Sequence, residues 1–242
     1  MATHAAALRP SRSAPLANEF RRIYVWEFPV RVTHWVNALA ITVLAVTGYL
    51  IGDPLTFWPT AGVEPSGQYW FGWIRFEHFA SAYVLLFALV FRFYWGFVGY
   101  RFARWANFIP LTKAQFLELK DTLFVDILEI KREGKIAIGH NFMAAASYLG
   151  LFAVTIFMVI TGFGLYAAMS DSWIPWLFSW IVPLMGSDQA VRRWHHIFMW
   201  AFVVFTVIHM YLAVFHDFVE GRGEISSMVG GWKFDRSDRP RK

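Results

Sequence analysis

Four long apolar stretches dominate the chain and predict its architecture. They cover about 33–51, 76–98, 144–167 and 194–216, and each ends at glycine, proline or charged residues. A helix of about 20 apolar residues can cross a hydrocarbon core of roughly 30 Å. The pattern therefore predicts an all-α membrane protein, a four-helix transmembrane bundle within residues 24–216.

The segments outside these stretches have patterns of their own. Residues 170–186 are apolar and Trp-rich but are interrupted by Pro175 and Pro183, which predicts an interfacial segment that does not span. Residues 112–132 have apolar positions at helical spacing, which predicts an amphipathic surface helix. We expect residues 1–23 to form a flexible leader and residues 217–242 a polar tail.

The basic residues are unevenly distributed, and their positions predict the orientation. Of 22 Lys and Arg, residues 1–31 hold 5, residues 99–143 hold 7 and residues 217–242 hold 6, which makes 18. Because Lys and Arg are enriched on the cytoplasmic side, both termini and the 99–143 loop are expected to be cytoplasmic, in a multi-pass protein of the inner cell membrane. The net charge of +5 then reflects topology, so membrane lipid is the expected partner and nucleic acid is not.

The composition restricts the cofactors that the chain can hold. With 57% hydrophobic and 16% charged residues, it argues against a soluble enzyme. The absence of cysteine excludes disulfides, thiolate-bound iron–sulfur clusters and covalent haem attachment. Several of the 8 histidines lie in or beside apolar stretches, where an ionisable group is costly and usually functional. Histidines are therefore the candidate cofactor ligands.

The spacing of these histidines predicts two pairs. His195 and His209 are 14 residues apart, which places them within about 40° on one helix face and about 21 Å apart along the axis. His196 lies about 140° from that face. His34, at the inner end of the first stretch, lies at the depth of His209. His78, at the outer end of the second, lies at the depth of His195. We therefore expect His78 with His195 on the outer side and His34 with His209 on the inner side.

Two pairs at different depths suit haem, since a low-spin iron takes one axial ligand from each face. A zinc or copper site needs three or four ligands that converge on one point. One such histidine near a helix end is equally consistent with an interfacial residue, but four in two pairs favour two noncovalent b-type haems. Gly48 and Gly162, each preceded by Thr, offer clearance for a macrocycle, although small residues also serve helix packing. No catalytic residue is predicted.

Haem propionates need positive partners at the membrane edges. The outer candidates are Arg75 and either Arg192 or Arg193. The inner candidates are Arg31 and Arg92, although for Arg92 we favour snorkelling to the cytoplasmic headgroups.

The remaining histidines have less specific roles. His140 and His216 lie on the inner side, where a quinone could accept protons, and a surface position explains each equally well. His196 could orient the outer haem or donate to a propionate, and His4 has no expected role.

A weak internal duplication relates the second and fourth stretches. Setting His78 on His195 also sets Arg75 on Arg192. The match is short, but it suggests that the two helices present a similar face.

Two segments resemble signatures of a known family. The segment 31–36 (RVTHWV), continuing to Thr47-Gly48, is similar to the first signature of the b-type cytochrome subunits of membrane-bound nickel–iron hydrogenases. The segment 194–197 (WHHI), continuing to His209, resembles the second. The similarity runs from about residue 24 to 232, and Arg193 and Phe142 depart from the family's pattern.

The resemblance implies a four-helix haem b anchor for the small and large subunits of a periplasm-facing nickel–iron hydrogenase. Electrons from the small subunit's iron–sulfur chain would reach the outer haem, then the inner haem, and then quinone near the cytoplasmic side. Gamma subunits of formate dehydrogenase share this general arrangement, so formate dehydrogenase or another quinone-linked oxidoreductase is the alternative partner. A structural anchor or transporter without a redox role is the third possibility.

Overall fold

Four helices of the computed structural model, which describes residues 20–53, 70–108, 142–220 and 223–236, are long and apolar enough to cross a membrane. They are α1 (Phe28–Gly52), α2 (Trp70–Val98), α4 (Phe142–Tyr166) and α7 (Asp188–Glu220). The predicted helical class and the four predicted spans agree with this structure. His4, His140 and the amphipathic helix expected at 112–132 lie outside the described residues.

Each helix is longer than the apolar stretch that predicted it. Helix α1 begins at Phe28 rather than at residue 33, and α7 covers Asp188–Glu220 rather than 194–216. Polar residues at the ends lower the hydropathy, but the helical hydrogen bonds continue through them into the interface. In α1 a proline occupies the first turn, where its missing N–H removes no helical bond.

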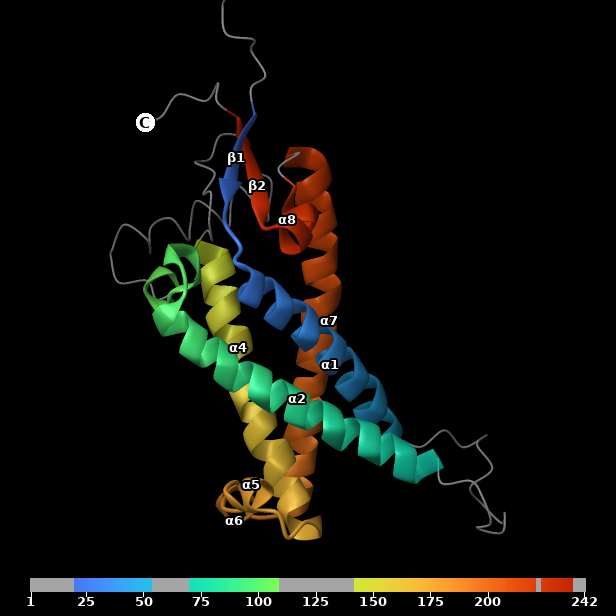
Figure 1. Ribbon diagram of the computed structural model, residues 1–242. Coiled ribbons are helices and arrows are strands. Elements are labelled where there is room, and N and C mark those ends of the chain that lie inside the picture. Colours follow the sequence, from blue (N-terminus) through green and yellow to red (C-terminus); the bar gives the residue numbers. More distant parts are fainter. Residues whose placement is uncertain (1–19, 54–69, 109–141, 221–222, 237–242) are drawn as a thin grey trace, which may run out of the picture.

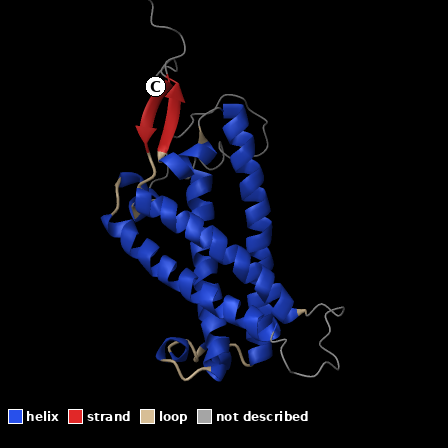
Figure 2. Ribbon diagram, turned by 45° about the vertical axis from the view of Figure 1, so that its right-hand side comes forward, coloured by secondary structure: helices blue, strands red, loops and turns tan. Residues whose placement is uncertain are grey.

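The helices form two adjacent pairs. Helix α1 packs along α2 and α4 packs along α7, and the two pairs cross each other (Figures 1 and 2). Contacts of α1 with α7 and of α2 with α4 join the pairs. At the end opposite the terminal strands, α5 (Trp173–Trp176) and α6 (Ile181–Leu184) pack against α4 (Figure 1). These two short helices occupy the 170–186 segment, which is too short to span.

The two chain ends meet in a small sheet. Strand β1 (Phe20–Tyr24) pairs antiparallel with β2 (Trp232–Arg236), which follows the short helix α8 (Glu224–Gly230). The Trp26 indole donates to Ser227 Oγ at 3.2 Å, and Lys233 Nζ lies 2.6 Å from Glu224 Oε2. Residues 20–23, which we expected to belong to a flexible leader, therefore form part of a strand. The sequence did not predict it because the pairing partner lies some 200 residues away and leaves no local signal.

Short 3₁₀ turns at the end of α2 enclose Arg92. Its guanidinium donates to the Ala103 carbonyl at 3.1 Å, within η1 (Arg101–Ala103), and lies over the rings of Trp105 in η2 (Trp105–Asn107), Phe108 and Tyr148. With a side chain only 7% exposed, Arg92 does not snorkel as we expected. The chain folds back over it and supplies a carbonyl and aromatic faces in place of lipid headgroups.

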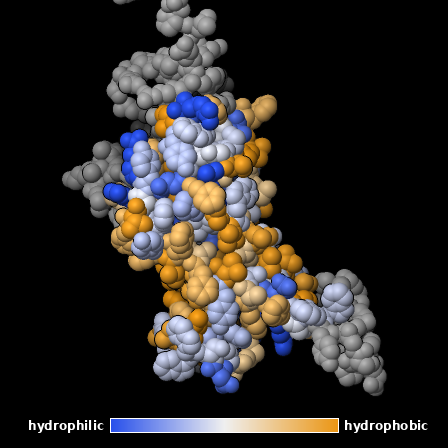
Figure 3. Space-filling view, in the orientation of Figure 1, coloured by the Kyte–Doolittle hydropathy of each residue, from blue (hydrophilic) through white to orange (hydrophobic). Residues whose placement is uncertain are grey.

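Apolar side chains cover the middle of the bundle, and hydrophilic ones gather near its upper end (Figure 3). Leu39, Phe87 and Val207 are each more than 60% exposed. Such a band matches the environment of a hydrocarbon core. The protein is therefore a multi-pass membrane protein.

Gly96 is expected to be intolerant of any side chain. A Cβ there would lie 2.1 Å from the Trp105 Nε1, whereas a Cβ at Gly150 would meet nothing within 4 Å. Gly96→Ala should therefore displace the ring that covers Arg92 and destabilise the fold by about 1–3 kcal/mol, the usual cost of overpacking. Thermal unfolding in detergent tests this, with Gly150→Ala as the control. Equal melting temperatures for the two variants would contradict the packing described.

Candidate functional site

His78 of α2 lies against a Thr-Gly pair of α1. Its Nδ1 is 2.9 Å from Thr47 Oγ1. The next residue, Gly48, brings the α1 backbone so close that an added Cβ would lie 3.2 Å from His78 Cε1. The hydroxyl thus supplies a hydrogen-bond partner, and the glycine supplies the room for the ring.

His195 of α7 has the same surroundings, supplied by α4. Its Nδ1 is 2.8 Å from Thr161 Oγ1, and a Cβ at Gly162 would lie 3.1 Å from its Cε1. Thr161 is completely buried. The duplication predicted between the second and fourth spans therefore extends to their partner helices, since each helix pair contributes one Thr-Gly and one histidine.

These two histidines form one site at the junction of the helix pairs. Gly48 of α1 is the point where they approach each other, since the space beside it is bordered by His78 of α2 and by α7 one turn after His195. Buried Met199 of α7 also reaches this junction, because its Sδ would be 3.6 Å from a Cβ on Gly48. The structure thus places His78 and His195 at the same junction, and their pairing around one cofactor stays a prediction.

His34 and His209 meet at the other depth. Their ring centroids are 6.3 Å apart with an interplanar angle of 56°. The His209 ring also stacks on Phe205, with 5.5 Å between centroids. Within the described residues, His34 Nδ1 and Asn37 Oδ1 are buried without a hydrogen-bond partner. The inner pair therefore has apolar support and unused polar atoms, in contrast to the outer pair.

His196 faces a different helix from His195. A Cβ at Gly52, the last residue of α1, would lie 3.1 Å from His196 Cε1 and 3.2 Å from its Nδ1. The two adjacent rings thus contact α1 and α4 separately, as an angle of about 100° between successive helix positions requires.

The candidate propionate partners lie in different surroundings. Arg192 is exposed and pairs with Asp188 at 3.6 Å, and Arg75 and Arg193 are exposed at the same end of the bundle. Arg31 donates to the Val229 carbonyl of α8, while its Nε is buried without a partner in the described part of the chain. Arg92 contacts aromatic rings and Ala103 rather than a histidine.

The residues present fit haem better than an ordinary metal site. Across the described residues, no three His, Cys, Asp or Glu side chains converge on one point. Two imidazoles that bind one metal ion from opposite sides, through bonds of about 2 Å, have centroids roughly 6 Å apart. The inner pair has this separation, with 6.3 Å between centroids. At the other pair, Gly48 and Gly162 give room to the rings of His78 and His195 themselves, so each ring is held where a side chain on the neighbouring helix would displace it.

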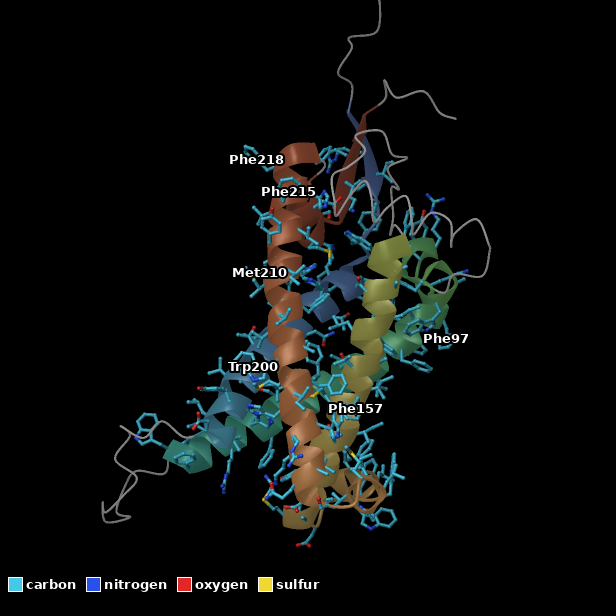
Figure 4. The ribbon with its side chains drawn as sticks, turned by 180° about the vertical axis from the view of Figure 1, so that it is seen from behind. Phe97, Phe157, Trp200, Met210, Phe215 and Phe218 are labelled. Atoms are coloured by element: carbon cyan, nitrogen blue, oxygen red, sulfur yellow. The ribbon has the colours of Figure 1, made fainter. Side chains whose placement is uncertain are left out.

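Aromatic side chains pack between the helices that carry the histidines. Phe157 of α4 lies against α7, where its ring is 4.7 Å from that of Phe198 (Figure 4). Trp200, labelled in the same view, contacts Tyr49 of α1 edge to face at 6.3 Å between centroids. An apolar, aromatic environment of this kind lowers the dielectric around a bound cofactor and influences its redox potential.

Sequence analysis identified the four histidines and both glycines but missed the two threonines as their partners. The signal was present, since Thr-Gly occurs at 47–48 and at 161–162. Its meaning depends on which histidine each dipeptide faces, and that is decided by helix packing.

A four-helix membrane bundle with two histidine pairs between its helices, in which His34, His78 and His195 are part-buried and His209 is more exposed, has the arrangement of a membrane-bound b-type cytochrome. Comparison with known sequences agrees: residues 25–231 match the prokaryotic cytochrome b561 family. The chain belongs to this family, and its members' name implies bound haem b.

Relatives over nearly the full length carry a more specific name. The chain is 45% identical to a probable Ni/Fe-hydrogenase B-type cytochrome subunit of Azotobacter vinelandii, over 90% of this chain and 91% of that protein. The protein of the same name in Bradyrhizobium diazoefficiens is 43% identical, over 86% and 85%. A probable Ni/Fe-hydrogenase 1 B-type cytochrome subunit of Escherichia coli K12 is 34% identical, over 87% and 90%. These matches confirm the predicted family resemblance.

Gly162 should be required for haem binding. Gly162→Ala places a methyl group 3.1 Å from His195 Cε1 and should displace that ring. We expect haem per chain to fall by up to half, measured by pyridine haemochrome in purified protein. Gly150→Ala, on the same helix and in open space, is the matched control and should keep its haem. Full haem content in Gly162→Ala would show that the cradle is dispensable.

Proposed function

We propose that this chain is a di-haem b-type cytochrome that carries electrons from a nickel–iron hydrogenase across the membrane to quinone. His78 and His195 hold the outer haem, and His34 and His209 hold the inner one. The observation that carries the proposal is the meeting of four histidines in two pairs at two depths of α7, about 21 Å apart along the helix.

When bound, the haems supply one-electron carriers near each face of the membrane. The chain supplies the axial nitrogens, the apolar surroundings and the clearance at Gly48 and Gly162. Arg75 and Arg192 are proposed propionate partners on the outer side, and Arg31 on the inner side. The chain is thus an electron-transfer subunit, and hydrogen is split in its partner.

The proposed orientation places both chain ends and the inner haem at the cytoplasm. The concentration of Lys and Arg in residues 1–31, 99–143 and 217–242 supports this orientation. Quinone is proposed to be reduced near the inner pair, with His140 as a possible part of its site. An open apolar groove between α1 and α2 supports this location, because Thr33, beside His34, is one of its lining residues and an isoprenoid tail is apolar.

The hydrogenase small and large subunits are the proposed partners. The names of relatives that cover most of the chain favour them over formate dehydrogenase. The exposed Trp173, Trp176 and Trp180 of the outer segment form a belt at the membrane interface and are a proposed docking surface for these subunits.

Each histidine pair should bind its haem independently. His209→Ala is expected to remove the inner haem and leave the outer one, and His195→Ala to do the reverse, because α7 contributes one ligand to each pair. Haem content and reduced-minus-oxidised spectra of purified protein measure both. His196→Ala is the matched control, since its ring packs on Gly52, and it should keep both haems. Retention of both haems in the first two variants would refute the pairing.

The partner can be identified by affinity purification. Tagged chain, solubilised in a mild detergent from its native membrane, should bring down a nickel-containing large subunit in roughly equal amount. Membranes that contain the native chain should reduce quinone with hydrogen. In the His209→Ala variant this rate should fall at least tenfold, while the large subunit is still recovered. Recovery of a formate-oxidising subunit instead would establish the alternative.

A further inference from the structure

The threonines beside the outer histidines have a second contact that determines where their protons point. Thr47 Oγ1 lies 2.6 Å from the Val43 carbonyl oxygen, one turn earlier in α1. Thr161 Oγ1 lies 2.8 Å from the Phe157 carbonyl oxygen in the same relation within α4. Hydroxyls in membrane helices commonly donate to the carbonyl four residues earlier.

A hydroxyl has one proton, and a carbonyl oxygen can only accept. When the hydroxyl proton is donated to Val43 or Phe157, the threonine oxygen can only accept a bond from the histidine. The Nδ1 atoms of His78 and His195, at 2.9 and 2.8 Å, must then carry the hydrogen. The opposite assignment would leave two oxygen atoms about 2.6–2.8 Å apart with no hydrogen between them.

A neutral imidazole with hydrogen on Nδ1 has its lone pair on Nε2. That nitrogen is the one free to bind a metal, and the partner of the other nitrogen usually decides which one binds. We infer that Thr47 and Thr161 are positioning residues that hold His78 and His195 in the Nδ1–H tautomer and present both Nε2 atoms to the outer haem. This inference rests on the proposed role of these histidines as axial ligands.

The two haems should differ for this reason. An acceptor on Nδ1–H makes imidazole a stronger electron donor, which stabilises the oxidised iron and lowers the reduction potential. The outer ligands have the two threonine oxygens, and His78 has the Leu44 backbone carbonyl as well, so the larger change is expected from Thr161→Val. At the inner pair, His34 Nδ1 has no partner among the described residues. Loss of a threonine hydroxyl should therefore change the outer haem alone.

The test replaces the hydroxyl without changing the shape of the side chain. In Thr161→Val and Thr47→Val the midpoint potential of the outer haem should rise, while that of the inner haem stays unchanged, in redox titrations of the purified protein followed by its absorbance. Thr161→Ser, which keeps a hydroxyl, should titrate like the native protein. Thr155→Val is the matched control, because Thr155 is also buried on α4 and donates to a carbonyl four residues earlier at 2.8 Å.

The outcomes separate the two claims. Unchanged potentials in both valine variants, or an equal shift in Thr155→Val, would overturn the positioning role. Loss of the outer haem in Thr161→Val but not in Thr161→Ser would support it, whereas equal loss in both would show that shape and not the hydroxyl matters. If His195→Ala keeps the outer haem, the proposed axial ligation itself is wrong. If His195→Ala loses that haem and the valine variants titrate normally, only the threonine inference fails.

Discussion

The bundle depends on holding polar imidazole rings between apolar helices. A ring nitrogen buried there without a hydrogen bond is costly, because the hydrocarbon core contains no water that could bond to it. The chain meets this constraint at the outer site with a threonine whose hydroxyl is bonded to its own helix and whose neighbouring glycine admits the ring. At this site the hydroxyl and the histidine come from different helices, so each hydrogen bond joins one packed pair, α1 to α2 and α4 to α7.

The outer and inner sites meet the constraint differently. At the outer site each helix pair supplies one Thr-Gly and one histidine, so the arrangement is nearly symmetric. At the inner site the rings of His34 and His209 lie 6.3 Å apart and tilted, and α8 covers the nearby end of α1 through Arg31 and Trp35, which donate to its carbonyls. The strand pairing of the chain ends holds α8 in that place. If both sites hold haem, as proposed, their unlike surroundings would give chemically identical cofactors different potentials.

Much of this could be predicted because hydropathy and helical spacing are local properties. Four spans followed from the length of the apolar stretches, and the face shared by His195 and His209 followed from 14 residues of regular helix. The position of Arg92 was predicted wrongly, because the turns that enclose it depend on how residues 99–108 fold back. The strand at residues 20–24 was missed for a similar reason, since its partner lies at the other end of the chain.

The sequence by itself determined that the chain has four helices long and apolar enough to cross a membrane, and it predicted histidines as the cofactor ligands and two depths for them. Only the tertiary structure decided that Thr47 bonds to His78 and Thr161 to His195, that His196 turns to Gly52, and that Arg92 is covered. The physical reason is that periodicity fixes which side chains share a helix face, whereas the rotation and crossing of helices decide which faces meet. A hydrogen bond acts over about 3 Å, so a partner across two helices is specified by packing and not by spacing.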